Sequence, residues 1–494
     1  MGYPTVHPTG VTIYDREKAY NGYTLFTSAK GALLINMNGK EVKLWSGLSG
    51  FPNKLLKGGQ ILGSSGTIDD ADNNLEQNDI IQVDWDGHIV WKIDHIDKLK
   101  INGEETWVSR QNHDYEREGS STGYYAPGQE AYSDHGRTIF VSHEALYDHK
   151  ISDKRLLDDK IVEVDWDGNV TWTWYPHEHF DEFGFREAQK NALFRNPFAK
   201  NPNNILGNYL CINSLSWVGP NHWYEEGDER FHPENIIVDC RNVNLMFIIS
   251  RETGKVVWKL GPDFEENEQV KKLGAIFGQH HFHMIPKGLP GEGNLLLFDN
   301  GGASGVGEPT PEGPEGRNIA SRGYSRVIEF NPVTLELIWQ YGAEEAGYFP
   351  FTDGFRFFSS YISSAQRLPN GNTLITEGAD GKLFEVTPEH EVVWEYIDPY
   401  EANIGGKYRM NQVFRAYRVP YDWVPQLPQQ EEVPVPKIDV STFRVPGASK
   451  GEGIGKITIV EGVDPNARLS TGSGGRNDEN EDNIVNFCVG SVRT

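Results

Sequence analysis

The chain has 494 residues, and its 46 Lys and Arg against 71 Asp and Glu give a formal net charge of −25 at pH 7. That charge argues against a surface that neutralises the phosphates of nucleic acid or of an anionic membrane. An apolar content of 37% excludes a disordered chain, and the absence of a long uncharged apolar run excludes a predicted transmembrane helix. The length fits several ordinary domains or one large repeat architecture.

Cysteine is scarce, and the N-terminus has no recognisable targeting sequence. Cys211, Cys240 and Cys488 are too few for a disulfide framework, and they form no CxxC metal motif. The stretch from Met1 to Pro4 lacks the basic and apolar regions of a secretory signal. We therefore expect a cytoplasmic protein, or a periplasmic or secreted one whose signal has been removed.

One pattern recurs along the chain: an alternating apolar run, a turn, and a second run that ends in Trp. In the first three copies the turn is Asn-Gly or Asp-Gly, which favours a hairpin because both residues tolerate positive φ. The copies run from Ala32 to Trp45, Ile80 to Trp91, Ile161 to Trp172, Phe247 to Trp258, Val327 to Trp339 and Leu383 to Trp394. We expect each Trp to pack one unit against the next.

A second, upstream hairpin accompanies several copies, for example from Leu368 to Ile375. Two hairpins make a four-stranded antiparallel unit, so the repeats predict an all-β fold, a six-bladed β-propeller over residues 1–423. Two other architectures stay open. A pair of β-sandwiches does not need one Trp-ended hairpin per unit, and a seven-bladed ring needs a further copy that we do not find.

Long insertions separate the units, the largest at 104–134, 176–207 and 301–322. The second contains a helical segment at 187–193. Such insertions form lids over a functional face, or serve as decoration or contacts between subunits, so a homo-oligomer is compatible with them. Residues 424–494 are predicted as a C-terminal extension: a Pro-rich extended linker at 425–436, a strand or two within 438–460, and a flexible tail at 470–482.

The innermost strand of each blade lines the channel of a propeller, so its residues are the candidates for chemistry. Gln111-Asn112-His113 and Gln279-His280-His281 follow one template, which places His113 and His281 at equivalent points of two blades. Because strand side chains alternate, His281 and His283 share a face and His280 points to the other.

Channel histidines suit three kinds of chemistry: a nucleophile that carries a transferred group, proton transfer near neutral pH, or binding of zinc or another transition metal. Hydrogen-bonded histidines in a wet channel are the structural alternative. Cys211 is either a nucleophile or, more commonly, a small core residue. Four arginines suit bidentate binding of an anion or a salt bridge: Arg241, Arg317, Arg322 and Arg326.

These segments resemble the bacterial-type, PAPS-independent arylsulfotransferase family, which is built on a six-bladed propeller. The matching stretches are 248–261, 277–281, 295–301 and 363–373, and the likeness runs from about Pro4 to Pro420. The resemblance implies a transfer in which a channel His takes a sulfuryl group from an aryl sulfate and passes it to a phenol, without a metal.

The resemblance also implies roles for single residues. The inner-strand His of the family's Gln-His motif maps onto His280. The family's His-x-Asn-Ser motif maps onto residues 211–214, where Cys211 replaces the His and Asn213 is kept. Arg317 and Arg322 are candidates for the family's Arg after the Phe-Asp-Asn-Gly turn. The family's sulfated His has no clear match.

We therefore predict an arylsulfotransferase-like enzyme that acts on a small aromatic substrate and needs no cofactor. The catalytic candidates are His280, His281 and His113, and the substrate-binding candidates are Cys211, Asn213, His283, Arg317, Arg322 and Arg367. Two alternatives stay open: a diverged member that uses His113, His281 and His283 for metal-assisted hydrolase or lyase chemistry, and a non-catalytic propeller that binds a ligand or partner.

Overall fold

The computed structural model describes residues 7–68, 75–197, 207–404, 406–428 and 430–439, residues 442 and 447, and the strands at 484–487 and 490–493. The chain divides into two units, Met1–Ile438 and Asp439–Thr494. In the second unit, β33 (Ile484–Phe487) and β34 (Gly490–Arg493) pair as an antiparallel hairpin. The predicted tail at 470–482, Cys488 and most of 438–460 lie outside the described residues.

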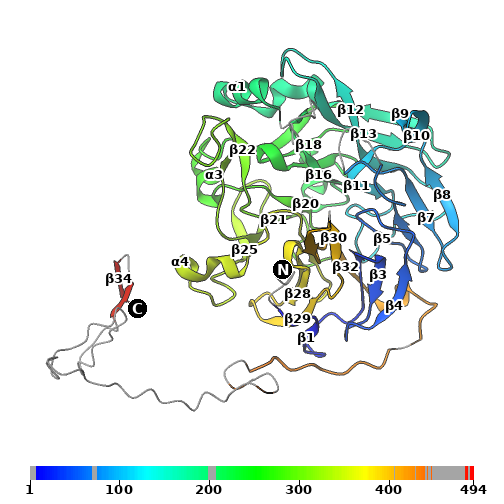
Figure 1. Ribbon diagram of the computed structural model, residues 1–494, viewed down its shortest axis with the longest axis vertical. Helices are drawn as coiled ribbons and strands as arrows, with labels where there is room; N and C mark the ends of the chain where they lie inside the picture. The colour runs from blue at the N-terminus through cyan, green and yellow to red at the C-terminus, as the bar shows by residue number, and fades with distance from the viewer. Residues whose placement is uncertain are drawn as a thin grey trace. The chain divides into compact units, whose positions relative to one another are not determined.

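In the first unit, six antiparallel sheets surround one axis and form a six-bladed β-propeller, which confirms the predicted fold (Figure 1). From the inner strand outward, blade 1 is β32 (Ala416–Val419), β2 (Tyr23–Ser28), β3 (Gly31–Ile35) and β4 (Glu41–Trp45); blade 2 is β5 (Lys54–Leu55), β6 (Ile61–Gly63), β7 (Ile80–Val83) and β8 (Ile89–Ile93); blade 3 is β11 (Gln111–Arg117), β12 (Thr138–Leu146), β13 (Leu156–Val164) and β14 (Val170–Trp174), with β15 (Gly207–Asn208) beside β13.

Blade 4 is β16 (Ile212–Trp217), β17 (Ile236–Cys240), β18 (Leu245–Ile249) and β19 (Val256–Leu260); blade 5 is β20 (His280–Met284), β21 (Leu295–Asp299), β24 (Arg326–Phe330) and β25 (Leu337–Tyr341); blade 6 is β26 (Ser364–Arg367), β27 (Thr373–Glu377), β28 (Lys382–Val386) and β29 (Val392–Ile397). The predicted Trp-ended hairpins are the two outer strands of each blade.

A Trp on the fourth strand of each blade, counted from the axis, ties that blade to the next one around the ring. The indole Nε1–H donates to a backbone carbonyl of the following blade, at 2.7–3.3 Å: Trp45 to Asp84, Trp91 to Trp166, Trp174 to Gly254, Trp258 to Pro332, Trp339 to Pro388 and Trp394 to Met37. Blade 3 differs from the prediction, because its donor is Trp174. Trp172, two residues earlier and therefore on the same face, meets the next blade through the Arg251 guanidinium.

The ring closes by pairing strands from the two ends of the propeller. The inner strand β32 pairs with β2, while β1 (Gly10–Tyr14) adds a fifth strand to blade 6 through β29. Residues 424–428 and 430–437, here called the C-terminal strap, cover the described part of the predicted linker and contact the ring. Val435 forms an antiparallel bridge with Tyr14, and the Glu432 carboxylate accepts the Met37 N–H at 2.9 Å.

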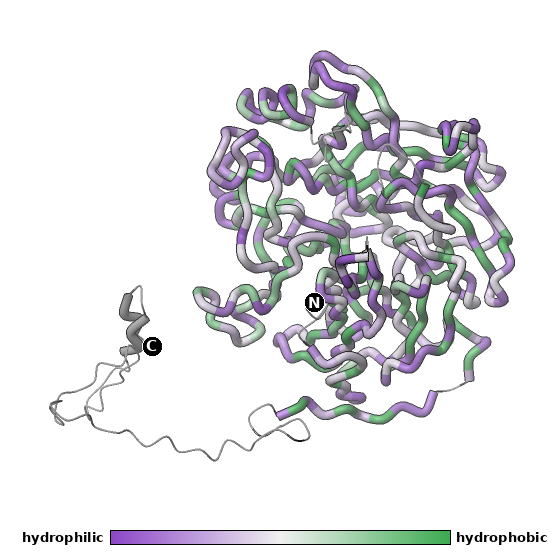
Figure 2. Tube along the Cα trace, in the orientation of Figure 1, coloured by the Kyte–Doolittle hydropathy of each residue, from purple (hydrophilic) through white to green (hydrophobic). Residues whose placement is uncertain are grey.

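Apolar side chains fill the space between neighbouring blades, and hydrophobic stretches follow the strands in Figure 2. Blades 4 and 5, for example, bury Ile248, Leu297 and Ile328 against one another. Similar clusters lie at the other blade contacts. The hydrophobic core is therefore distributed around the ring, and polar residues are left to line the axis.

The segments between the strands carry short elements. The insertion expected between units at 301–322 lies inside blade 5, between β21 and β24. Hairpins are formed by β9 (Asp97–Ile101) with β10 (Glu104–Val108), β22 (Ser304–Val306) with β23 (Arg317–Ala320), and β30 (Ala402–Ile404) with β31 (Tyr408–Met410). The helices are α1 (Glu187–Arg195), α2 (His222–Glu225), α3 (Glu268–Leu273) and α4 (Pro350–Asp353), with 3-10 turns at Pro176–Phe183, Glu229–Phe231, Arg241–Val243, Gly354–Arg356, Gly378–Asp380 and Tyr421–Trp423. The helix expected at 187–193 is α1. Within the described part of the chain, every helix is too short or too polar to cross a bilayer.

Candidate functional site

The inner strands of blades 3, 4 and 5 bend where they enter the channel. His113, Cys211 and His281 have φ angles of 61°, 58° and 56°, in the left-handed region that residues other than glycine rarely adopt. Each bend lies in or next to an irregularity in the pairing of the inner strand. The shared backbone agrees with the predicted equivalence of His113 and His281, and it frees side chains from the regular β-ladder.

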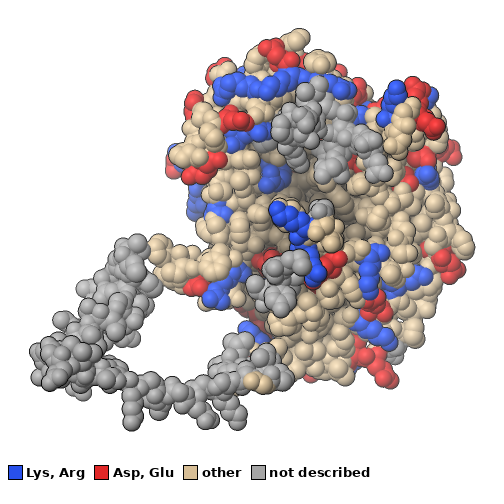
Figure 3. Space-filling model, in the orientation of Figure 1, with Lys and Arg blue, Asp and Glu red and all other residues tan. Residues whose placement is uncertain are grey.

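A cavity of about 700 Å³ opens at this end of the channel. Figure 3 shows the corresponding face of the propeller hollowed near its centre, with basic side chains beside the hollow. The polar residues that line the cavity include His113, Cys211, Arg241, Asn242 and His280, and its larger apolar residues include Phe51, Tyr361, Ile362, Met410 and Phe414. Three predicted site residues, His113, Cys211 and His280, therefore converge on one cavity.

His280 is held as a neutral imidazole. Its Nδ1 lies 3.0 Å from the carbonyl oxygen of Gly278 and 2.8 Å from Oδ1 of Asn300, while the backbone N–H of Ile362 points to Nε2 at 3.2 Å. A carbonyl only accepts, so Nδ1 carries the hydrogen and Nε2 carries a lone pair. Burial, together with the nearby Arg241 charge, lowers the pKa of His280 to about 3.

Arg241 brings a positive charge to the same cavity. Its guanidinium donates to Oδ1 of Asn242 and to the carbonyl of Ala303, both at 3.3 Å. It forms no ion pair with a carboxylate anywhere in the described ranges, and burial lowers its pKa below the usual value. A partly exposed guanidinium without a carboxylate partner among the described residues is suited to receive an anion such as a sulfonate.

An aromatic wall faces these polar groups. The rings of Phe51 and Phe414 lie 4.7 Å apart between centroids, and the His113 ring lies 6.4 Å from the first and 6.1 Å from the second. Flat aromatic surfaces favour a ligand that is itself aromatic, through offset or edge-to-face contact. The cavity thus combines a site for an anion with a site for a ring.

His281 and His283 lie elsewhere in the channel, outside the cavity lining. Their rings are 4.4 Å apart, and the Tyr124 hydroxyl lies 3.0 Å from Nε2 of His283, whose Nδ1 faces the carbonyl of His281 at 2.9 Å. Burial lowers the pKa of His281 well below the usual value and that of His283 to about 4. These two predicted residues form a neutral, buried pair.

The remaining predicted residues bind other parts of the protein. Asn213 donates to the carbonyl of Gln279 at 2.8 Å, and three arginines pair with carboxylates: Arg317 with Glu315 at 3.5 Å, Arg322 with Asp299 at 2.7 Å and Arg367 with Glu329 at 2.5 Å. The proposed metal set is divided between the cavity (His113) and the channel (His281 and His283). Across the residues that the structure describes, no group of three His, Cys, Asp or Glu side chains is arranged to hold a metal ion.

A buried charged cluster crosses the axis. Nζ of Lys54 on blade 2 binds Asp114 at 2.9 Å and Glu116 at 2.5 Å on blade 3, and Arg415 binds Asp114 at 2.6 Å and the carbonyl of Asn213 at 2.7 Å. Burial raises the pKa of Glu116 to about 8. This axial cluster satisfies its cations internally, in contrast to Arg241.

Sequence reasoning missed several features of the cavity. Phe51, Phe414 and Asn300 were not singled out, and Arg241 was only one of four arginines. Arg241 follows β17, and its backbone N–H donates to the carbonyl of Cys211 at 3.1 Å. Predicting that strand pairing would therefore have placed Arg241 beside Cys211, whereas the aromatic wall gave no local signal.

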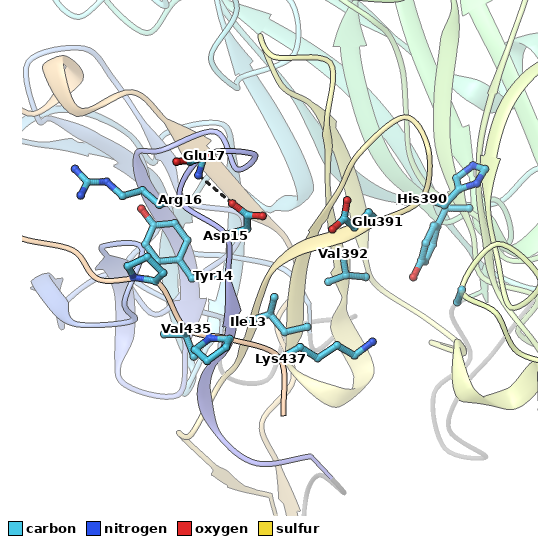
Figure 4. A pocket seen from close by; sticks show the side chains of 14 residues that line it. Ile13, Tyr14, Asp15, Arg16, Glu17, His390, Glu391, Val392, Val435 and Lys437 are labelled. Carbon is cyan, nitrogen blue, oxygen red and sulfur yellow. Dashed lines mark hydrogen bonds between the residues drawn. The ribbon is translucent and has the colours of Figure 1, made fainter. Parts of the chain in front are cut away.

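A second cavity of about 880 Å³ lies at the outer edge of blade 6, between β1, β29 and the C-terminal strap. Figure 4 shows its charged side chains, among them Arg16, Glu391 and Lys437, spread around the hollow and not directed at one point. No residue predicted to be functional lines it. Binding sites combine apolar walls with a few convergent polar groups, so the channel cavity is the better candidate.

Comparison with known proteins gave one sequence match. A protein-family model described as Arylsulfotransferase (ASST) matches residues 129–415, which is more than half of the 494 residues. No curated protein matched the chain. Solved structures with similarity include a protein of unknown function from Bacteroides caccae, at 12% identity and a TM-score of 0.39 over 81% of this chain and 99% of that one. A streptogramin B lyase is 12% identical, with a TM-score of 0.33 over 80% of this chain and 85% of that one. Virginiamycin B lyase from Staphylococcus aureus is 10% identical, with a TM-score of 0.29 over 70% of this chain and 69% of that one.

Proposed function

Because the chain belongs to the arylsulfotransferase (ASST) family, we propose that its channel cavity binds an aryl sulfate and that His280 accepts the sulfuryl group. The observation that carries the proposal is the state of His280: a neutral ring whose Nε2 lone pair lies in a cavity that also contains Arg241. A nucleophilic His must be deprotonated at the attacking nitrogen, and this one is held so by its partners.

The two ends of an aryl sulfate match the two halves of the cavity. Its sulfonate oxygens pair with the Arg241 guanidinium, whose partners among the described residues are a carbonyl and an amide and include no carboxylate. Its ring packs against Phe51 and Phe414. Cys211 lies where the resemblance places a family His, so this chain has one fewer strong hydrogen-bond donor and depends more on Arg241.

In the first half-reaction the Nε2 lone pair attacks sulfur, and a nitrogen–sulfur bond forms. The bond between sulfur and the aryl oxygen breaks, and its electron pair leaves with the phenolate, which takes a proton from the imidazolium form of His113 and leaves that ring neutral. Nδ1 keeps its hydrogen, so the sulfated ring is cationic and still donates to Asn300 and Gly278. Their oxygens stabilise the positive charge that develops on the ring.

In the second half-reaction a phenol takes the place of the first product. Its oxygen attacks sulfur, the nitrogen–sulfur bond breaks, and the electron pair returns to Nε2. The phenol proton passes to His113, which lines the cavity beside the aromatic wall. A new aryl sulfate leaves, and the neutral His280 is restored.

The test is a transfer assay with p-nitrophenyl sulfate as donor and a second phenol as acceptor, with metal analysis of the same preparation. We expect nitrophenol release that depends on the acceptor, together with a burst without acceptor that leaves one SO₃ on His280 in peptide mass spectra. Labelling of another residue would contradict the role of His280. Stoichiometric zinc, iron or copper without transfer would reject the proposal and favour metal-assisted chemistry.

A further inference from the structure

The turn at residues 359–363 is strained next to the proposed nucleophile. Ile362 and Ser363 have φ angles of 52° and 91°, so two consecutive non-glycine residues lie in the left-handed region. A β-branched residue is a true outlier there, and such strain persists only where surrounding contacts enforce it. The turn belongs to the segment that leads into blade 6, whereas His280 lies on blade 5.

Asn300 enforces this turn. Its Nδ2 donates to the carbonyl of Ser359 at 2.7 Å and to that of Ile362 at 2.8 Å, while its Oδ1 faces Nδ1 of His280 at 2.8 Å. One fully buried side chain thus joins the strained turn to the imidazole. The two donated bonds also fix the orientation of the Asn300 amide, since its oxygen must face the His280 hydrogen.

This strained turn directs a backbone N–H group toward the imidazole of His280. The N–H of Ile362 points to Nε2 of His280 at 3.2 Å, and Ile362 lines the cavity. Once Nε2 bonds to sulfur, its lone pair is used, and this N–H loses its acceptor. A buried amide without a partner is costly, and the nearest new acceptors are the oxygens on that sulfur, two bonds from Nε2.

We infer that the Ile362 N–H is a catalytic donor that binds a sulfuryl oxygen while the group is transferred to and from His280, and that Asn300 is the positioning residue that holds it. The inference rests on the proposed function, which it deepens. In the ligand-free site the N–H occupies the lone pair, and in the reacting site it stabilises the oxygens as charge redistributes.

The test replaces residue 362 by the α-hydroxy acid analogue of isoleucine, which keeps the side chain and removes only the N–H. We expect the rate of His280 sulfation by p-nitrophenyl sulfate to fall by about 10²- to 10³-fold, with a small change in KM. The matched control is the same kind of exchange at Leu368 of blade 6, whose N–H donates to the carbonyl of Asn372 at 2.8 Å and which lies outside the cavity lining. That variant should keep its transfer rate.

Equal rates in the wild type and the 362 ester would overturn the inference, as would an equal loss in the two esters. Failure of the proposed function is distinct, because then the wild type itself transfers nothing. If the ester variant does not fold, wild-type protein labelled with ¹⁵N-isoleucine gives a second measurement. The Ile362 amide signal should move when p-nitrophenyl sulfate is added without acceptor, and an unchanged signal would also reject the inference.

Discussion

Two buried histidines in this propeller have opposite charge states. His143 lies on β12 of blade 3, with Nδ1 2.8 Å from the Glu76 carboxylate and Nε2 3.0 Å from the Asp159 carboxylate and 2.8 Å from Nδ2 of Asn112. Burial opposes its charged form, but the hydrogen bonds to Asp159 and Glu76 prevail and raise its pKa to about 9. His280 has an amide and a carbonyl as partners, and its pKa is lowered to about 3. Burial favours the neutral form of both imidazoles, and the two carboxylate partners of His143 overcome it.

Two arginines, Arg415 and Arg241, differ in the same way, because one has a carboxylate partner and the other has none among the described residues. Arg415 in the axial cluster is bound by Asp114, whereas Arg241 in the cavity has no carboxylate partner within the described residues. Charges that are paired inside the protein stabilise the ring, and because their hydrogen-bonding groups are already used they bind a ligand only weakly. Within the described part of the chain, the cavity keeps a neutral histidine and a cation without a carboxylate partner, which is the combination that the proposed anionic substrate requires.

The largest expected effect comes from removing the neutral histidine. His280→Gln keeps a side chain of similar size but has no lone pair on a basic nitrogen. We expect sulfuryl transfer to fall at least about 10³-fold with thermal stability nearly unchanged, as measured by nitrophenol release and calorimetry. Retained transfer in this variant would move the nucleophile elsewhere and break the contrast with His143.

The same substitution at the charged histidine should have the opposite outcome. His143→Gln leaves Glu76 and Asp159 buried without that cation, so the free energy of unfolding should fall by about 3 kcal/mol. The folded fraction should keep its kcat, since His143 does not line the cavity. Urea titration gives the first quantity and activity per folded molecule the second. A loss of kcat comparable to that of the His280 variant would contradict the structural role.

The pH dependence of stability follows from the raised pKa of His143. Its pKa is about 9 in the folded protein and near 6.5 when exposed, so its stabilisation is complete below pH 6.5 and is lost as pH rises through 9. We expect unfolding free energy to decrease by about 3 kcal/mol between pH 6.5 and 10. Glu116, whose pKa is raised to about 8, acts in the same direction. The difference between the wild type and His143→Gln should therefore shrink at high pH, and a constant difference would show that His143 is neutral.

The arginine contrast predicts an effect on binding. Arg241→Gln should raise the KM for p-nitrophenyl sulfate by about 10- to 100-fold, the usual worth of a charge-assisted hydrogen bond. Arg367→Gln is the matched control, because Arg367 pairs with Glu329 and lies outside the cavity lining. We expect it to reduce stability and leave KM unchanged. The reverse result would restore Arg367 as the anion-binding residue that the sequence suggested.

Features that depend on neighbouring residues were predictable from the sequence. The Asn-Gly and Asp-Gly turns and their Trp-ended hairpins predicted the blades, since each hairpin is specified within a short stretch. The wall of Phe51 and Phe414 was not predictable in this way. Phe414 precedes β32, which reaches blade 1 only because the ring closes between chain segments far apart in sequence.

The same limit applies to the candidate site. His113, Cys211 and His280 were identified because they lie on inner strands with recognisable templates. Strand alternation predicted that His280 and His281 point apart, but the pairing of β20 is irregular between His280 and His283, so the bend at His281 also sets their positions. The role of Asn300 depends on a turn from the next blade, and the charge state of His280 depends on partners that are distant or backbone groups. No spacing in the sequence encodes these contacts.

The smallest expected effect concerns a structural charge near the surface. Glu432 of the C-terminal strap accepts hydrogen bonds from the Tyr421 hydroxyl and from the Met37 N–H, the latter at 2.9 Å. Glu432→Gln preserves the shape and weakens these charge-assisted bonds, so unfolding free energy should fall by about 1 kcal/mol. Transfer activity should not change, because the strap lies at the outer edge of the ring and away from the cavity. A loss of activity with unchanged stability would mean that the strap acts on the candidate site. Glu432 would then contradict the rule that charges paired within the protein serve stability and that unpaired charges serve the site.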